Sequence, residues 1–319
     1  MKHAFVFPGQ GAQKIGMLAD FAASYPIVQQ TFQEASEILG YDLWKLTQTG
    51  PEELLNQTDK TQPALLAAGV SIWRIWQQQG GPLPAFMAGH SFGEYTALVC
   101  AGALAFQEAV SLAENRGRFM QTAVPQGQGA MAAILGLEDS KIIAICAEVA
   151  QGGAVVSAVN FNAPGQTVIA GHTQAVETAI ETAKTAGAKK AVLLTVSVPA
   201  HCSLMQPAAD QMAHCLAKVN FRSPAISVIH NVDVSSKTHP DEIRHALVAQ
   251  LYSPVRWVET IQTLEAKGVT QLFECGPGKV LASLNKRITR HMTVFSLGET
   301  LQNFAQALQA CSEEATICN

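Results

Sequence analysis

The chain has 319 residues, of which 48% are hydrophobic and 14% are charged, and its formal net charge is -4. This length and apolar content allow a full hydrophobic core, which excludes intrinsic disorder and small disulfide-stapled scaffolds. The mildly acidic balance without a basic run argues against nucleic acid and against an anionic membrane surface as partners.

The first elements follow the order strand, tight turn, helix. A strand is predicted at 3–7, before the turn Pro8-Gly9-Gln10-Gly11, and a second strand at 85–88 runs into Gly89-His90-Ser91-Phe92-Gly93. This order is typical of an α/β layer structure. Helices of this part are predicted at 25–39, at 61–79, after Gly93 and at 106–124.

The pattern changes between residues 127 and 196. The segments predicted there are strand 129–135, helix 138–150, strand 154–160, strand 167–170, helix 173–186 and strand 190–196. This βαββαβ order predicts a ferredoxin-like subdomain at 127–196, inserted into one α/β body formed by residues 1–126 and 197–319. The body resumes with helices at 203–216, 241–251 and 256–267 and from 278 and 299, and with strands at 226–229 and 270–274.

Seven scattered cysteines without a C-x-x-C pair argue against a zinc site or a disulfide framework and predict reduced thiols. The longest apolar stretch, 97–106, is far shorter than the roughly 18 residues of a membrane span. The apolar run at the N-terminus is also too short for a signal peptide. We therefore expect a soluble, cytoplasmic protein.

The segment Gly89 to Gly93 fits G-x-S-x-G, and its context of strand before and helix after is that of a nucleophile elbow. Such a turn lifts a serine hydroxyl above the sheet edge, and its flanking glycines leave room for a strained backbone. The alternative is that Ser91 and Glu94 form a capping box for the following helix. Capping does not require either glycine, so the pattern favours Ser91 as a nucleophile.

A serine nucleophile needs a base, and His201 is the preferred candidate. It lies in Val198-Pro199-Ala200-His201-Cys202, between a predicted strand and a helix, where loops present functional groups. His230, at the end of the predicted strand 226–229, is the second candidate.

Arg116 stands out on the helix predicted at 106–124. With Ala109, Ala113 and Met120 it recurs at helical spacing, so it lies on the apolar face. A buried guanidinium without an anion is costly, and no acidic residue shares this stripe. The pattern therefore predicts an anion from elsewhere, with a ligand carboxylate as a natural candidate.

Two glycine turns do not support a nucleotide site. The first lacks the third glycine of G-x-G-x-x-G, because Lys14 occupies that position, and Gly276-Pro277-Gly278-Lys279 lacks the spacing of a P-loop. No H-E-x-x-H occurs either. We expect no cofactor and no metal.

Taken together, the motifs resemble the malonyl-CoA:acyl carrier protein transacylase family of bacterial fatty acid synthesis. The resemblance spans residues 3 to about 300. The segments that carry it are 8–13, 61–64, 89–94, 116–117, 160–166, 199–201, 250–252 and 276–278.

The resemblance implies an α/β-hydrolase-like body with a ferredoxin-like insert and a ping-pong transfer of malonyl from malonyl-CoA to the pantetheine thiol of acyl carrier protein. It implies that Ser91 is the nucleophile, that His201 is its base and that a carbonyl oxygen of Gln250 orients the imidazole. Backbone N–H groups of Gln10 and Phe92 would form the oxyanion hole.

The resemblance further implies that Arg116 binds the malonyl carboxylate. Phe92 departs from the leucine that is frequent at this position, and its larger ring could narrow the acyl pocket, which favours small acyl groups. The tolerance for other acyl groups therefore stays open, as do the oligomeric state, the preferred carrier and the branch of the pathway.

A serine hydrolase such as a thioesterase is the alternative, since it shares the elbow. It would place an acidic residue between Ser91 and His201 in chain order, where Asp139 and Glu148 are candidates. A noncatalytic carrier-binding protein is a third possibility, which the combination of Ser91, His201 and Arg116 disfavours.

The carrier proteins of this pathway are strongly acidic, so docking should use local positive charge. The alternative, ordinary solvated surface, stays open for each basic cluster. The candidate docking residues are Lys189, Lys190, Lys286, Arg287 and Arg290.

Overall fold

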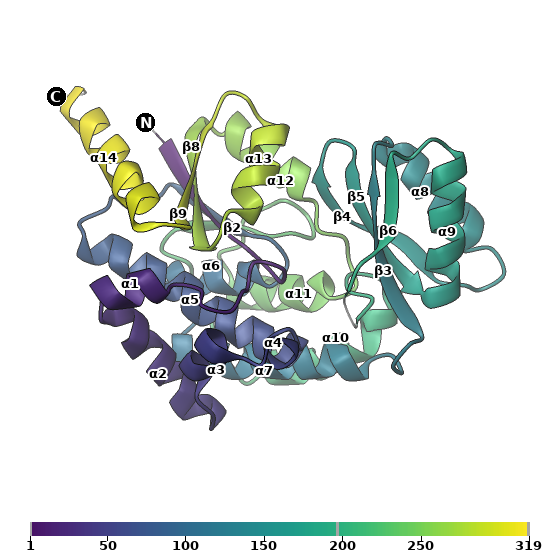
Figure 1. Ribbon diagram of the computed structural model, residues 1–319, viewed down its shortest axis with the longest axis horizontal. Helices are drawn as coiled ribbons and strands as arrows, with labels where there is room; N and C mark the ends of the chain where they lie inside the picture. Colours follow the sequence, from purple (N-terminus) through teal and green to yellow (C-terminus); the bar gives the residue numbers. More distant parts are fainter. Residues whose placement is uncertain (1, 196–197, 318–319) are drawn as a thin grey trace.

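The computed structural model describes residues 2–195 and 198–317, which form two sheets lying side by side (Figure 1). The larger sheet has five parallel strands in the order β7-β2-β1-β8-β9. In chain order they are β1 (Lys2–Phe7), β2 (Phe86–Gly89), β7 (Ser227–Ile229), β8 (Val269–Pro277) and β9 (Thr293–Gly298).

Both faces of the larger sheet are buried, as expected of a parallel sheet. Along β1, Ala4 and Val6 belong to one core cluster, whereas Phe5 and Phe7 belong to the other. The alternation follows from the two-residue period of a strand. The helices around this sheet that contribute to the site are α5 (Thr58–Gln78), α6 (Gly93–Cys100), α7 (Phe106–Thr122), α11 (Pro240–Gln250), α12 (Trp257–Ala266) and α13 (Val280–Ile288). The others are α1 (Ala19–Ser24), α2 (Ile27–Leu39), α3 (Leu43–Thr49), α4 (Glu52–Leu55), α10 (Gln206–Leu216) and α14 (Leu301–Ile317), with a 3-10 turn at Ser203–Met205.

The smaller sheet is antiparallel, with the order β4-β5-β3-β6 that defines a ferredoxin-like arrangement. Its helices cover the face turned away from the larger sheet, and they enclose a separate core (Figure 1). The fold class expected from the sequence is confirmed. The elements are β3 (Gly129–Leu135), α8 (Asp139–Val149), β4 (Val156–Ala163), β5 (Gln166–His172), α9 (Thr173–Thr185) and β6 (Lys190–Leu193).

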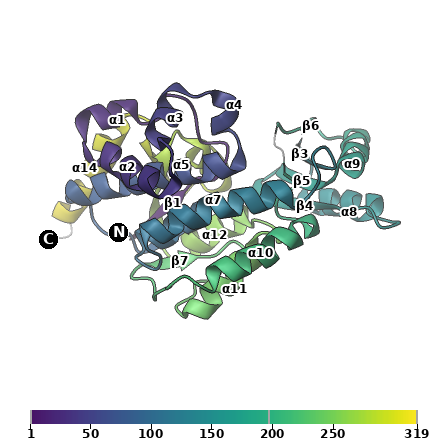
Figure 2. The same ribbon diagram turned by 90° about the horizontal axis from the view of Figure 1, so that it is seen from below.

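The two sheets are joined at the β4 edge of the smaller one. Phe161 N donates to Val255 O at 3.0 Å, and Val255 N donates to Val159 O at 2.8 Å. Arg287 on α13 reaches the β4–β5 turn, where it donates to Pro164 O at 3.1 Å and to the Gln166 side chain. Helix α7 runs from the body toward the smaller sheet (Figure 2). These contacts fix the smaller sheet beside the body.

Several elements differ from the sequence prediction. Strand β9 was not expected, because an edge strand pairs on one side only and TVFSLG is partly exposed, which weakens its apolar alternation. The short helices α1, α3 and α4 were also not expected. The strand predicted at 190–196 ends at Leu193, and residues 196–197 lie outside the described residues. Among the described residues no helix has the length and hydropathy to cross a bilayer.

Candidate active site

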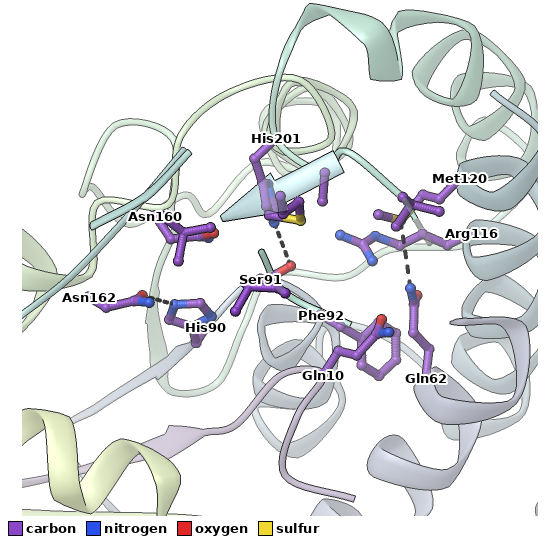
Figure 3. A pocket seen from close by; sticks show the side chains of 15 residues that line it. Gln10, Gln62, His90, Ser91, Phe92, Arg116, Met120, Asn160, Asn162 and His201 are labelled. Atoms are coloured by element: carbon purple, nitrogen blue, oxygen red, sulfur yellow. Dashed lines mark hydrogen bonds between the residues drawn. The ribbon is translucent and has the colours of Figure 1, made fainter. Parts of the chain in front are cut away.

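Ser91 lies on a strained turn between β2 and α6. Its φ is 51°, in the left-handed region that costs a non-glycine residue roughly 1–2 kcal/mol. A Cβ on Gly89 would lie 1.9 Å from the Gly93 carbonyl carbon, and a Cβ on Gly93 would lie 2.0 Å from Phe7 O. Both glycines are therefore required by backbone contact, as the elbow interpretation predicts. The Ser91 hydroxyl points toward His201 in Figure 3.

The capping box considered from the sequence does not form. Helix α6 has Phe92 as its N-cap, with no side-chain cap hydrogen bond. The Ser91 N–H donates instead to Asn231 Oδ1 at 2.8 Å, and Asn231 Nδ2 donates to Gly89 O at 2.7 Å. Glu94 is fully buried and faces other partners. The turn is thus fastened from both sides by one asparagine that sequence analysis missed.

His201 lies within hydrogen-bonding distance of Ser91. The Ser91 Oγ to His201 Nε2 distance is 2.7 Å, and His201 Nδ1 lies 2.8 Å from the Gln250 backbone carbonyl oxygen. Because that carbonyl can only accept, Nδ1 carries the proton and Nε2 is left to accept from the hydroxyl. Burial, and then the positive charge of Arg116, lower the pKa of His201 to about 3. The imidazole is therefore neutral at physiological pH, as a base must be.

The other candidate bases and orienting acids lie elsewhere. His230 Nδ1 is 2.7 Å from Glu94 Oε1, and His230 does not line the pocket that holds Ser91. Asp139 accepts a hydrogen bond from Thr167, and Glu148 is exposed on α8. The group in contact with His201 Nδ1 is the Gln250 backbone carbonyl, where a hydrolase triad would have an acidic side chain.

Arg116 is buried on α7, with 1% of its surface exposed, as the helical spacing predicts. Its Nη2 donates to Gln250 Oε1 at 3.0 Å, a neutral partner, so the anion expected from the sequence stays a prediction. Its guanidinium carbon lies 5.6 Å from the Tyr95 ring centre and 5.8 Å from that of Phe92. Its Nε has no hydrogen-bond partner among the described residues. Figure 3 shows the guanidinium directed from α7 toward Ser91 and His201, where it can receive an anion.

Two backbone donors lie in the same pocket as Ser91. Gln10 and Phe92 both line the pocket with Ser91. Within the parts of the chain that the structure describes, neither backbone N–H has a hydrogen-bond partner. Unpaired donors beside a nucleophile are suited to an oxyanion that develops during attack.

The pocket has a volume of about 180 Å³ and lies between the body and the smaller sheet. His90 crosses this gap, with its Nε2 2.7 Å from Asn162 Oδ1 on β4 (Figure 3). Phe92 is 1% exposed and stacks on Tyr95 with ring centres 5.5 Å apart, so its ring forms part of the wall. The residues that line the pocket are Gln10, Gln62, His90, Ser91, Phe92, Arg116, Met120, Met131, Asn160, Asn162, Val168, Leu194, Val198, Ala200 and His201.

The described side chains give little support to a metal centre. They contain no group of three or more His, Cys, Asp or Glu residues that could hold an ion. All cysteines up to Cys311 are free thiols. Burial raises the pKa of Cys202, which follows His201 directly, to about 11, so this thiol is not activated as a nucleophile.

The candidate docking residues are exposed on two separate elements. Lys190 begins β6 and Lys189 directly precedes it, whereas Lys286 and Arg287 lie in the last turn of α13 and Arg290 follows that helix. Arg287 also holds the β4–β5 turn, so its charge is shared with an intramolecular role. Lys286 is the clearer surface charge of that pair.

Known proteins are similar to this chain over most of its length. Residues 4–301 match the acyl transferase domain family. Malonyl CoA-acyl carrier protein transacylase of Escherichia coli (strain K12) is 61% identical over 296 residues, which cover 93% of this chain and 96% of that protein. The protein of the same name from Bacillus subtilis (strain 168) is 42% identical over 313 residues, which cover 98% of each chain.

Solved structures agree with these similarities. The malonyl CoA-acyl carrier protein transacylase from Coxiella burnetii superposes with a TM-score of 0.95 at 54% identity, over 97% of both chains. A malonyl-transacylase solved in complex with a type II PKS acyl-carrier protein gives a TM-score of 0.95 at 55% identity, over 97% of this chain and 100% of that one.

Proposed function

The chain belongs to the malonyl CoA-acyl carrier protein transacylase family, and on that premise we propose how its own residues carry out the reaction. The enzyme is an acyltransferase that moves a malonyl group from malonyl-CoA to acyl carrier protein, for use in fatty acid synthesis. The observation that carries the residue assignment is the 2.7 Å contact between Ser91 Oγ and His201 Nε2, with Arg116 in the same pocket.

In the first half-reaction Ser91 Oγ attacks the thioester carbonyl of malonyl-CoA. His201 Nε2 takes the hydroxyl proton as the C–O bond forms, and the N–H groups of Gln10 and Phe92 stabilise the oxyanion. The C–S bond then breaks, and His201 returns the proton to the coenzyme A sulfur. The product is malonyl-Ser91 and free coenzyme A.

In the second half-reaction the pantetheine thiol of the carrier attacks malonyl-Ser91. His201 Nε2 takes the thiol proton and returns it to Ser91 Oγ when the ester C–O bond breaks. One thioester replaces another over the cycle, so the chemistry needs no energy source, and we propose that the enzyme uses no cofactor or metal.

Arg116 selects the acyl group in this proposal. A malonyl carboxylate would pair with the guanidinium nitrogens that Gln250 leaves available, whereas an acetyl group would leave them unmatched. A buried donor set built for a polar group rejects an analogue that lacks it by roughly 10⁴-fold. Phe92 in the pocket wall supports a preference for small acyl groups.

Three finer assignments belong to the same proposal. The catalytic body comprises residues 1–126 and 197–319, and the subdomain comprises residues 127–196. Carrier docking uses a basic cluster at Lys189 and Lys190 or at Lys286, Arg287 and Arg290. A cytoplasmic location fits the free thiols of the described cysteines.

Mass analysis of the Ser91 peptide after exposure to malonyl-CoA tests the assignment. Transfer predicts a malonyl adduct that persists in buffer and disappears when carrier protein is added, and Ser91→Ala should show none. Rapid loss of the adduct in buffer alone would identify a hydrolase. Absence of any adduct in the parent chain would contradict Ser91 as the nucleophile.

A further inference from the structure

Glu94 is a fully buried carboxylate that is not among the described residues lining the pocket. Its Oε1 lies 2.7 Å from His230 Nδ1. Its Oε2 accepts from Asn231 N at 2.9 Å and from Gln250 Nε2 at 2.9 Å. A buried charge is retained only where it is paired or hydrogen-bonded, and here its partners are the residues that organise the site.

Gln250 links this carboxylate to the substrate-binding arginine. One end of its amide accepts from Arg116 Nη2 at 3.0 Å, and the other donates to Glu94 Oε2 and, at 2.9 Å, to Ser91 O. Reversing the amide would place two donors face to face at Arg116. The positive guanidinium of Arg116 and the negative carboxylate of Glu94 together fix the orientation of the Gln250 side-chain amide. The backbone carbonyl of the same Gln250 accepts from His201.

Asn231 links the same carboxylate to the nucleophile. Its backbone N–H is held by Glu94, while its side chain holds Ser91 N and Gly89 O. Glu94 Oε2 thus holds both Asn231, which fastens the elbow, and Gln250, which contacts His201 and Arg116.

We propose that Glu94 is a positioning residue for malonyl transfer and the resident counter-charge of Arg116, acting through Gln250 and Asn231. This inference rests on the proposed function. It predicts that the negative charge of a carboxylate that does not line the pocket weakens the preference for malonyl over acetyl.

Glu94→Gln isolates the charge. The new amide oxygen can accept from Asn231 N and Gln250 Nε2, while the new NH₂ donates to His230 Nδ1 after the imidazole proton moves to Nε2. Among the residues that the structure describes, His230 Nε2 has no hydrogen-bond partner, so this tautomer exchange breaks no other hydrogen bond. Each of these hydrogen bonds can form in Glu94→Gln, while the negative charge of residue 94 is lost.

Removing that charge has opposite effects on the reactions with the two acyl substrates, malonyl-CoA and acetyl-CoA. A malonyl carboxylate becomes the sole counter-ion of Arg116 and no longer experiences repulsion from Glu94, whereas acetyl leaves the guanidinium without any anion. We expect the ratio of kcat/KM for malonyl-CoA over acetyl-CoA to rise about tenfold in Glu94→Gln. Any change in the reactivity of Ser91 or His201 alters kcat/KM for malonyl-CoA and for acetyl-CoA alike, and therefore cancels in this ratio.

Glu94→Ala removes the acceptor altogether. Gln250 and Asn231 then lose their common anchor, and kcat for malonyl loading should fall about 100-fold. Glu274→Gln is the matched control, because Glu274 is also fully buried and accepts two backbone N–H groups, from Leu281 and Ala282, outside the pocket. We expect it to lower thermal stability and leave the malonyl:acetyl ratio unchanged.

The decisive measurement is the ratio in Glu94→Gln with and without Arg116→Ala. A rise in the single variant that disappears in the double variant supports the proposal. An unchanged ratio in the single variant, the same rise without Arg116, or a Glu94→Gln chain that does not fold would each overturn it. Malonyl-Ser91 formation by the parent, measured in the same assay, separates these outcomes from a failure of the proposed function.

Discussion

Ser91 and Asn231 are 140 positions apart in the chain, yet the Asn231 amide oxygen accepts the Ser91 backbone N–H at 2.8 Å. The same amide donates to Gly89 O, so it spans the elbow on both sides of its strained residue. A left-handed conformation at a serine persists only where surrounding contacts enforce it. The energy stored in the turn is therefore balanced by a residue from a distant loop.

Asn231→Asp should weaken the enzyme without removing any reacting group. The carboxylate can still accept from Ser91 N, but it would place an oxygen against Gly89 O in place of a donor. We expect kcat for malonyl loading to fall at least tenfold, with a loss of stability of about 1–3 kcal/mol. Stopped-flow release of coenzyme A and urea unfolding measure the two effects, and parent-like kcat would show that the elbow holds its shape alone.

Arg116→Ala should lose selectivity more than reactivity. Ser91, His201 and the two backbone donors remain, so a neutral serine-directed sulfonyl fluoride should still modify Ser91 at a similar rate. The malonyl:acetyl ratio of kcat/KM should fall by roughly 10²–10⁴, because the carboxylate loses its partner.

Arg118→Ala is the matched control for Arg116→Ala, since Arg118 is an exposed arginine of the same helix that bonds to Asn115. It should keep the parent ratio. Retained malonyl preference in Arg116→Ala would refute the assignment of this arginine.

The rate of malonyl loading should not change with pH around the ordinary pKa of histidine. Burial lowers the pKa of His201 to about 3, so the neutral base is present throughout the range above it and is lost only as pH falls toward that value. We expect kcat/KM for coenzyme A release to be flat between about pH 5.5 and 8, where a free imidazole of pKa about 6.5 would titrate. A fall with a midpoint near pH 6.5 would show that His201 protonates as an ordinary histidine.

Lys286→Glu tests carrier docking on α13. Reversal of an exposed charge facing an acidic partner should raise the KM for carrier severalfold, mainly through slower association. Malonyl loading from malonyl-CoA should be unaffected.

The control for Lys286→Glu is Lys141→Glu, an exposed lysine on α8, the outer helix of the smaller sheet. If both variants keep the parent KM, docking at α13 is wrong, and the Lys189 and Lys190 cluster becomes the remaining candidate.

The sequence by itself determined the features that depend on local pattern. The βαββαβ order predicted the ferredoxin-like sheet, because strand and helix periods differ and the turns between them are short. The elbow was predictable because its two glycines are required by contacts within the strand-turn-helix unit and with the first strand. Helical spacing likewise placed Arg116 on a buried face.

Only the tertiary structure decided how distant residues meet. The sequence contains two plausible histidines, and only the structure shows that His201 is the one that lies 2.7 Å from Ser91 Oγ, with the Gln250 backbone carbonyl at its other ring nitrogen. Asn231 and Glu94 carry no motif of their own as positioning residues, since their roles arise from hydrogen bonds across 136 or more positions. Edge strand β9 was likewise not predictable from its own residues, because it is defined by its hydrogen bonds to β8 and lacks a clear apolar–polar alternation. Local patterns fix what each segment is, whereas buried polar groups must find partners wherever the fold supplies them, and that choice is made in three dimensions.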